Sequence, residues 1–180
     1  MSSGFPACAI LLATLFLAGP VALAQQATET AIKAAFLYKF AGYIEWPGSA
    51  FAAPDAPIAI GTLASDEVAA ELEIAVTNRT VNGRRVVVRR LREGDSPQGL
   101  HLLFVGRREP NPRSALRAAQ QNGVLTVTET TLDAGSAINF VLTEERVAFE
   151  VSLEAAERGG HRISSRMLAV ARRVVSKGTL

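Results

Sequence analysis

Apolar residues in the first part of the chain recur with the period of a helix. From Thr28 onward, apolar side chains are spaced by four residues and form a stripe widened by alanine and leucine: Ile32, Ala35, Phe36, Leu37, Phe40, Ala41 and Ile44. This spacing predicts an amphipathic helix with a broad buried face. Trp46-Pro47-Gly48 predicts its end, because the residue before a proline is pushed out of the helical region.

Short apolar runs then alternate with helical segments. The pattern predicts strands at 56–63, 84–91, 100–105 and 124–127, and helices at 67–76 and 113–122. Strands rich in β-branched residues that alternate with helices favour an α/β sheet covered on both faces.

The last third predicts a different arrangement. Segments 137–142 and 146–153 are strand-like and separated by Thr143-Glu144-Glu145, which predicts a hairpin. Apolar residues from Ile163 to Val174 predict a final amphipathic helix. The predicted fold class is α/β: a single domain with a mixed, mainly parallel sheet flanked by helices, a C-terminal β-hairpin and a final helix.

The first 24 residues predict an export signal. They contain no charged side chain, and their unbroken apolar part is too short to span a membrane comfortably. Ala22-Leu23-Ala24 has the small-x-small pattern that signal peptidase recognises. We therefore expect a signal peptide at 1–24, cleavage after Ala24, and an exported, periplasmic domain at 25–180. Met1 to Pro6 lacks Lys and Arg, which leaves open whether Met1 is the true start.

Composition narrows the function classes. The chain has 19 basic and 17 acidic side chains and a net charge of +2, which argues against a nucleic-acid protein held mainly by phosphate contacts. The one cysteine, Cys8, lies in the predicted signal peptide, so neither a disulfide framework nor a thiolate zinc site is expected.

Motifs for catalysis or cofactor binding are not found. The sequence lacks a GxGxxG fingerprint, a GxSxG elbow and an HExxH motif, and His101 and His161 have no ligand companions nearby. We therefore expect no catalytic residue, no metal and no cofactor, and a protein that is not an enzyme. Six arginines between Arg79 and Arg92 either protect an edge strand or face an acidic partner.

Aromatic residues give the strongest local signal. Phe36 and Phe40 fit the buried stripe, but Tyr38 lies well round the predicted helix from them. Tyr38 is therefore a candidate for a partner surface or groove.

The segment from Ile32 to Pro47, IKAAFLYKFAGYIEWP, resembles the opening motif of the YfiR family of periplasmic proteins. Later motifs agree in order: NGVLTV at 122–127, GSAINF at 135–140, RVAFEVS at 146–152 and ISSRML at 163–168. The resemblance covers nearly all of the predicted mature chain, and its first and last motifs are the most specific.

The resemblance implies a negative regulator. Such a protein binds the periplasmic sensor region of an inner-membrane diguanylate cyclase, holds the enzyme inactive, and so lowers cyclic di-GMP and biofilm formation. It further implies an outer-membrane lipoprotein that sequesters the regulator, and a homodimer. As partner-binding residues we consider Tyr38, Tyr43, Arg166 and Met167, if the two terminal motifs pack together. The alternative is that these four side chains complete the core and its rim.

A second function class remains open. An α/β sheet offers a crevice at its strand ends, so the protein could instead be a periplasmic sensor of a small ligand.

Overall fold

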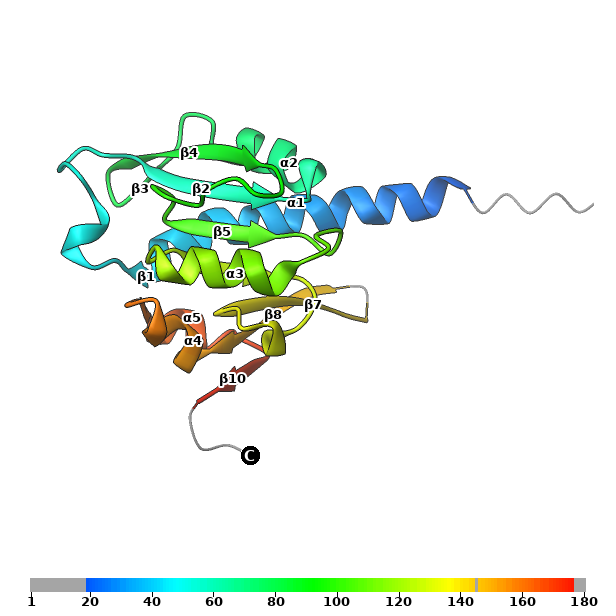
Figure 1. Cartoon of the computed structure of the whole chain (residues 1–180). Coiled ribbons are helices and arrows are strands. Elements are labelled where there is room, and N and C mark those ends of the chain that lie inside the picture. The colour runs from blue at the N-terminus through cyan, green and yellow to red at the C-terminus, as the bar shows by residue number, and fades with distance from the viewer. Residues whose placement is uncertain (1–18, 145, 177–180) are drawn as a thin grey trace, which may run out of the picture.

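An eight-stranded mixed sheet forms the centre of the computed structural model, which describes residues 19–144 and 146–176 (Figure 1). The strand order is β10-β8-β7-β6-β5-β2-β4-β3. These strands are β2 (Ile58–Leu63), β3 (Thr80–Val81), β4 (Arg84–Leu91), β5 (Leu102–Val105), β6 (Leu125–Thr128), β7 (Ile138–Thr143), β8 (Arg146–Ser152) and β10 (Arg173–Val175).

The middle of this sheet is parallel. Strands β4, β2, β5, β6 and β7 run in one direction, β8 is antiparallel to β7, and β10 is parallel to β8. The short strand β3 is antiparallel to β4. The prediction of an α/β fold with a mixed, mainly parallel sheet and a β7–β8 hairpin is confirmed.

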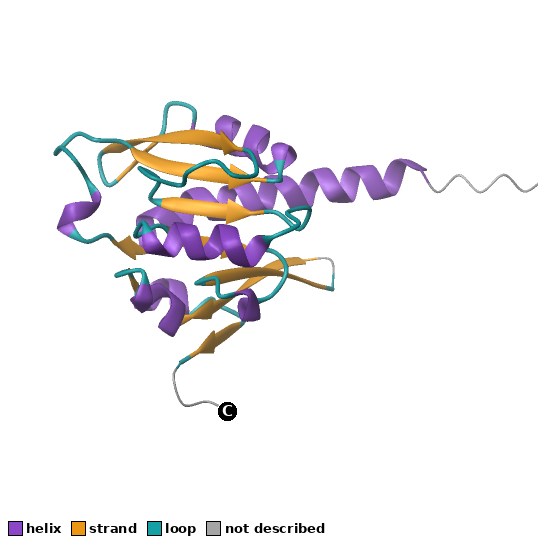
Figure 2. Ribbon diagram, in the orientation of Figure 1, coloured by secondary structure: helices purple, strands orange, loops and turns teal. Residues whose placement is uncertain are grey.

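Helices cover both faces of the sheet (Figure 2). Helices α1 (Gly19–Tyr43) and α2 (Asp66–Val76) lie on one face, and α3 (Pro112–Gln121) lies on the other. Strand β2 is buried along its whole length, as are β5 and β6, because a central parallel strand has helices on both sides. The core accordingly divides into a larger cluster under α1 and α2 and a smaller one under α3.

Helix α1 contains the helix predicted from Thr28, but it begins earlier, at Gly19. Its buried face is also turned from the predicted stripe. Leu37, Phe40, Ala41 and Ile44 are buried, whereas Ile32 is 37% exposed. Lys33 is buried instead. Polar groups are tolerated inside only when they are paired, and one of the two partners of this lysine, Glu129, lies far away in the sequence.

The predicted final helix from Ile163 to Val174 is wrong in its extent. Helix α5 spans only Ser165–Leu168, and the chain then forms β10 at Arg173–Val175. Met167 is buried, while Val170 is 71% exposed. A helix continued to Val174 would place the apolar residues of this segment on one face. Instead, the Arg173 side chain forms two hydrogen bonds with Glu150 of β8 and holds β10 at the edge of the sheet.

The segment after α1 and a segment near the C-terminus meet in a second, two-stranded sheet. Strand β1 (Ile44–Glu45) pairs with β9 (Arg162–Ile163), and the Ser164 backbone N–H donates to the Tyr43 carbonyl at 2.9 Å. The first and last motifs therefore pack together, which is the condition under which we considered their residues as one surface. Helix α4 (Leu153–Arg158), which was not predicted, begins where the Ser152 hydroxyl accepts from the Ala155 N–H.

The arginine-rich strand β4 lies second from the edge. Strand β3 pairs only with Arg84 and Arg85, so the outer side of β4 is open beyond them. Arg90 contacts Glu73 of α2 through two 2.9 Å hydrogen bonds. This arrangement fits the edge-protection alternative.

Most of the predicted signal peptide lies outside the described residues, and α1 begins at Gly19, within the remainder. Figure 1 shows the first turns of α1 extending past the sheet. Across residues 19–144 and 146–176, no helix combines the length and apolar character required to cross a bilayer.

Candidate functional site

The carboxyl ends of the central strands meet at one edge of the sheet. Leu63 of β2 is paired with Val105 of β5, and Val105 is paired with Thr128 of β6. From β2 the chain continues through α2 to β4, which lies on one side of β2 in the sheet. It later returns to β5, which lies on the other side of β2. A change of direction of this kind leaves a crevice between the loops that follow the two strands, and α/β proteins bind ligands there.

The two loops are in close contact at this point. The Gly106 N–H donates to the Leu63 carbonyl at 2.8 Å. A Cβ atom at position 106 would lie 2.5 Å from the Ala64 carbonyl oxygen, so only glycine fits there without a shift of the main chain. Ala64 itself has a φ of +56°, a conformation that a residue other than glycine seldom adopts.

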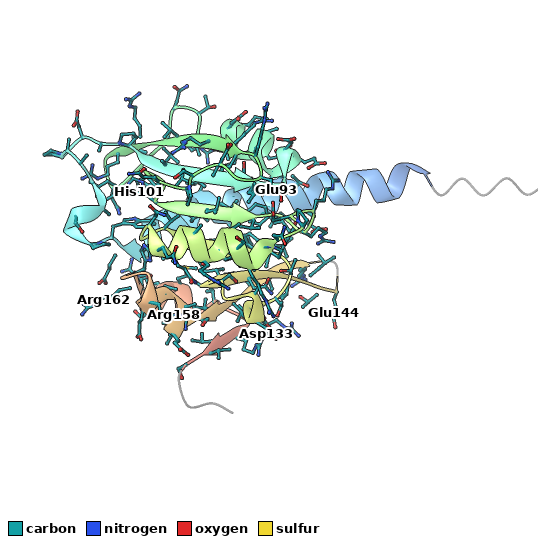
Figure 3. The ribbon with its side chains drawn as sticks, in the orientation of Figure 1. Glu93, His101, Asp133, Glu144, Arg158 and Arg162 are labelled. Carbon is teal, nitrogen blue, oxygen red and sulfur yellow. The ribbon has the colours of Figure 1, made fainter. Side chains whose placement is uncertain are left out.

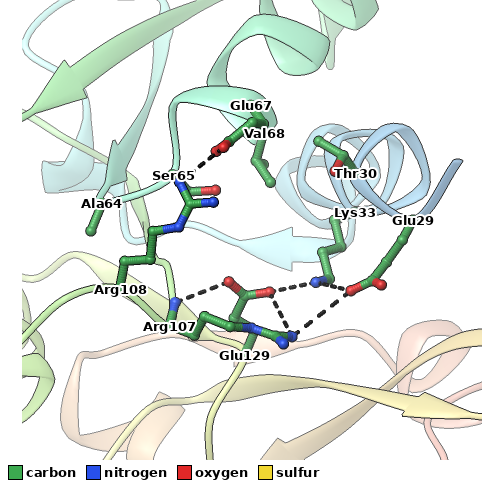
Figure 4. A pocket seen from close by; sticks show the side chains of 10 residues that line it. All are labelled: Glu29, Thr30, Lys33, Ala64, Ser65, Glu67, Val68, Arg107, Arg108 and Glu129. Carbon is green, nitrogen blue, oxygen red and sulfur yellow. Dashed lines mark hydrogen bonds and ion pairs between the residues drawn. The ribbon is translucent and has the colours of Figure 1, made fainter. Parts of the chain in front are cut away.

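A buried ion-pair cluster forms the floor of the crevice (Figure 4). The Lys33 ammonium contacts the carboxylates of Glu29, one helical turn earlier, and Glu129, which follows β6. The side chains of Lys33 and Glu129 are 7% and 9% exposed. The Glu129 carboxylate also accepts the Arg107 backbone N–H at 2.9 Å. One lysine therefore ties α1 to the loops after β5 and β6.

The rim of the crevice carries exposed arginines. The Arg107 guanidinium lies 3.5 Å from Glu129, and Arg108 lies 2.9 Å from Glu67 of α2. The backbone N–H of Glu67 and the Arg108 side chain hold the pKa of the Glu67 carboxyl below its usual range, so this group is ionised at neutral pH.

Together these residues enclose a half-open cavity of about 350 Å³. Its lining includes three carboxylates and three cationic groups, from Glu29, Lys33, Glu67, Arg107, Arg108 and Glu129. Such a site can hold a polar ligand by charge and hydrogen bonding. Within the described part of the chain, no group of three or more potential metal ligands occurs.

The four residues predicted to bind a partner lie at the end of α1 and in α5. Tyr38 is half-buried, and its hydroxyl donates to the Thr80 carbonyl at 3.0 Å. Tyr43 is 40% exposed, and Arg166 is exposed. Met167 is 1% exposed. Met167 is therefore a core residue, and its predicted place on a binding surface is wrong in this structure.

Sequence reasoning missed the charged crevice entirely. Lys33 is part of the opening motif, but its burial depends on Glu129, 96 residues later. The available signal was Glu29, an acid four residues before a lysine on a predicted helix. That pattern usually marks an exposed pair, so it did not indicate burial.

A family model for YfiR/HmsC-like proteins matches residues 30–172. The chain belongs to the YfiR/HmsC-like family. This match spans every strand of the sheet except β10, which begins directly after it, and it includes both terminal motifs. Membership in the YfiR/HmsC-like family indicates a regulatory protein linked to diguanylate cyclase control.

Solved structures give only a distant likeness. A conserved domain protein from Vibrio cholerae matches with a TM-score of 0.49 and 12% identity, over 65% of this chain and 54% of that chain. An ABC domain from Streptococcus pneumoniae, solved in complex with L-Trp, matches with a TM-score of 0.47 and 12% identity. This match covers 66% of this chain and 55% of that chain. This chain thus spans about half the length of each. No curated protein matches the sequence.

Proposed function

We propose that this protein is an exported regulator that binds the periplasmic sensor region of an inner-membrane diguanylate cyclase. Binding holds the cyclase inactive and so lowers cyclic di-GMP and biofilm formation. The observation that carries the proposal is the family match over residues 30–172. Export rests on the sequence of residues 1–24, and mass spectrometry of the exported chain should find Gln25 at its N-terminus.

The binding surface that we propose is the junction surface, made of the exposed residues Tyr43, Glu45, Arg162 and Arg166 where β1 and β9 pair. It joins the two most specific family motifs. An exposed tyrosine beside arginines is typical of protein interfaces, since both residue types are enriched at binding hot spots. Glu45 lies beside Tyr43, and Glu157 lines a shallow cavity with Arg162, so the surface is mixed in charge.

Repression follows from a difference in affinity. A regulator that binds the inactive cyclase more tightly than the active one shifts the population toward inactivity. About 1.4 kcal/mol of differential binding changes the ratio tenfold.

The charge reversal Arg166→Glu tests the junction surface. We expect it to weaken binding to the purified sensor region at least tenfold while leaving the melting temperature near that of the wild type, because Arg166 is exposed. Arg117→Glu is the matched control, since Arg117 is exposed on α3 across the sheet. If both variants bind like the wild type, the surface lies elsewhere, and if the wild type binds no cyclase sensor, the function is refuted.

The crevice favours a second candidate function, a sensor of a small polar ligand. Its cavity of about 350 Å³ lies where α/β proteins bind ligands and is lined by charged groups. A thermal-shift screen tests this candidate, since a ligand that binds the folded state raises its melting temperature. A shift that is lost in Arg107→Gln would support it, because the Arg107 side chain is exposed on the rim.

An outer-membrane lipoprotein that sequesters the regulator, and a homodimer, complete the proposal. Neither the lipoprotein nor the homodimer is needed for cyclase binding. Analytical ultracentrifugation of the purified protein measures its oligomeric state directly.

A further inference from the structure

Both histidines of the chain lie against its one tryptophan, at the end of the sheet opposite the crevice. The Trp46 ring centroid is 5.7 Å from that of His101 and 5.3 Å from that of His161, with the rings near perpendicular in both pairs. The histidines are only 8% and 2% exposed. Figure 3 shows His101 at this end of the molecule, with Arg162 of β9 on the same side. A fold that brings these three rings together from distant segments links α1, β5 and the C-terminal region.

The hydrogen bonds of His101 require an uncharged ring. The Ala59 backbone N–H donates to Nδ1 at 3.1 Å, so Nδ1 carries no proton. Nε2 lies 3.0 Å from the Ala50 carbonyl and therefore donates to it. Protonation at Nδ1 would set two N–H donors against each other in a buried position. His101 thus joins η1 (Gly48–Ala50) to β2 only while it is neutral.

His161 is enclosed even more fully. A Cβ atom at Gly159 would lie 2.7 Å from its Nδ1, which shows how closely the chain covers the ring. Within the described residues neither ring nitrogen makes a hydrogen bond of good geometry, although the main chains of Gly123 and Ala156 lie close enough to favour the charged form. Burial is the larger effect and lowers the pKa of His161, and the nearby His101 lowers it further.

The charged groups around the cluster do not compensate for burial. Burial lowers the pKa of His101, and Arg84 adds to this, against the opposing hydrogen bond to Ala50. A shallow cavity beside His161 is lined by Glu45, Glu157 and Arg162, but neither carboxylate forms a hydrogen bond with the ring.

The segment between α1 and β2 depends on these rings. Residues 46–57 contain no regular element except the three-residue η1. Phe51 stacks on His101, with 4.6 Å between the ring centroids. The Arg84 guanidinium lies over the Phe51 ring, 3.8 Å from its centroid. The same guanidinium donates to the carbonyls of Ala53 and Ala56. Trp46 Nε1 donates to the Ala41 carbonyl at 3.0 Å. Side chains, more than backbone pairing, hold this segment down.

We propose that His101, Trp46 and His161 form an acid-sensitive latch: protonation of the histidines releases residues 46–57 from the end of the sheet, while the sheet itself stays folded. Release would expose Trp46 and Phe51 beside Tyr43, which line a common shallow cavity. The latch goes beyond the proposed function and does not depend on cyclase binding.

Trp46 is the only tryptophan, so its fluorescence reports on the latch directly. In a titration of the purified protein from about pH 8 to about pH 5, we expect the emission maximum to move reversibly to longer wavelength, with a midpoint below 6.5, the ordinary pKa of histidine. Far-UV circular dichroism should stay unchanged over the same range. An emission maximum that does not move, or that moves only together with the dichroism, overturns the latch.

Substitutions of the two histidines distinguish the contribution of each ring to the pH-dependent emission shift. His101→Gln and His161→Phe should each reduce the pH-dependent shift, and the double variant should abolish it, whereas a full shift in the folded double variant contradicts the proposal. If the double variant does not fold, NMR of the wild type decides, because only two histidine Cε1–H signals are present. Both should titrate below 6.5 in step with the emission change, and a midpoint at or above that value overturns the latch.

Discussion

Lys33 is buried in α1 while its apolar neighbour Ile32 faces outward. The lysine is stable there because Glu29 and Glu129 neutralise the ammonium. The hydrophobic stripe located the helix but could not reveal this pairing, since Glu129 belongs to a loop after β6.

Replacing this lysine should therefore destabilise the protein. Lys33→Met leaves two carboxylates close together and largely buried, and removal of one partner of a buried pair costs about 3 kcal/mol. The free energy of unfolding in urea measures this loss. The double variant Lys33→Met, Glu129→Gln should recover part of it, whereas equal instability of the two variants would contradict the pairing.

Gly106 offers a second test at the residue scale. Gly106→Ala should destabilise the fold and disturb the crevice, because the new methyl group would lie 2.5 Å from the Ala64 carbonyl oxygen. Gly48→Ala is the control, since nothing lies within 4 Å of its Cβ position. Thermal unfolding compares them, and similar melting temperatures for the two variants would refute the close approach of the loops.

At the scale of elements, the sequence predicted the central strands and helices well. Strand 84–91 was predicted with its observed bounds, and α2, α3 and β6 lie within one residue of the prediction. These segments have a clear period because both sides of the sheet are covered. The C-terminal region has no such simple environment. Its apolar spacing fits a helix, but the ion pair of Arg173 with Glu150 favours a strand.

Strand β10 should consequently depend on Glu150. The Arg173 side chain holds the pKa of Glu150 below its ordinary value of 4.5, so the pair stabilises β10 above that pH and is lost as the pH falls through the lower value in the folded state. Glu150→Gln should speed amide hydrogen exchange in residues 173–175 at neutral pH. Unchanged exchange would show that the pair does not hold the strand.

Some residues of the candidate site could be predicted from the sequence, and others could not. The terminal motifs led to Tyr43 and Arg166, which are exposed, but also to Met167, which is buried. Helical spacing alone could not separate them because α5 is a single turn. The charged crevice was beyond prediction, since it combines side chains from α1, α2 and the loops after β5 and β6.

For the whole molecule, stability should depend on pH below neutrality. The folded-state pKa values of His101 and His161 are lowered from 6.5 by burial, so the unfolded chain binds more protons. The stabilisation is complete above about pH 6.5 and falls by up to about 1.4 kcal/mol per pH unit for each histidine as the pH decreases. Urea unfolding at several pH values measures this slope, and a flat profile between about pH 7 and 5 would contradict it.

The proposed regulation acts on the level of cyclic di-GMP in the cell. Family membership and the exposed junction surface together support a regulator that acts by binding. The most direct measurement is intracellular cyclic di-GMP in a strain from which this gene is deleted. We expect a rise that is reversed by the wild-type gene and by Arg117→Glu, but not by Arg166→Glu. An unchanged level after deletion would contradict it.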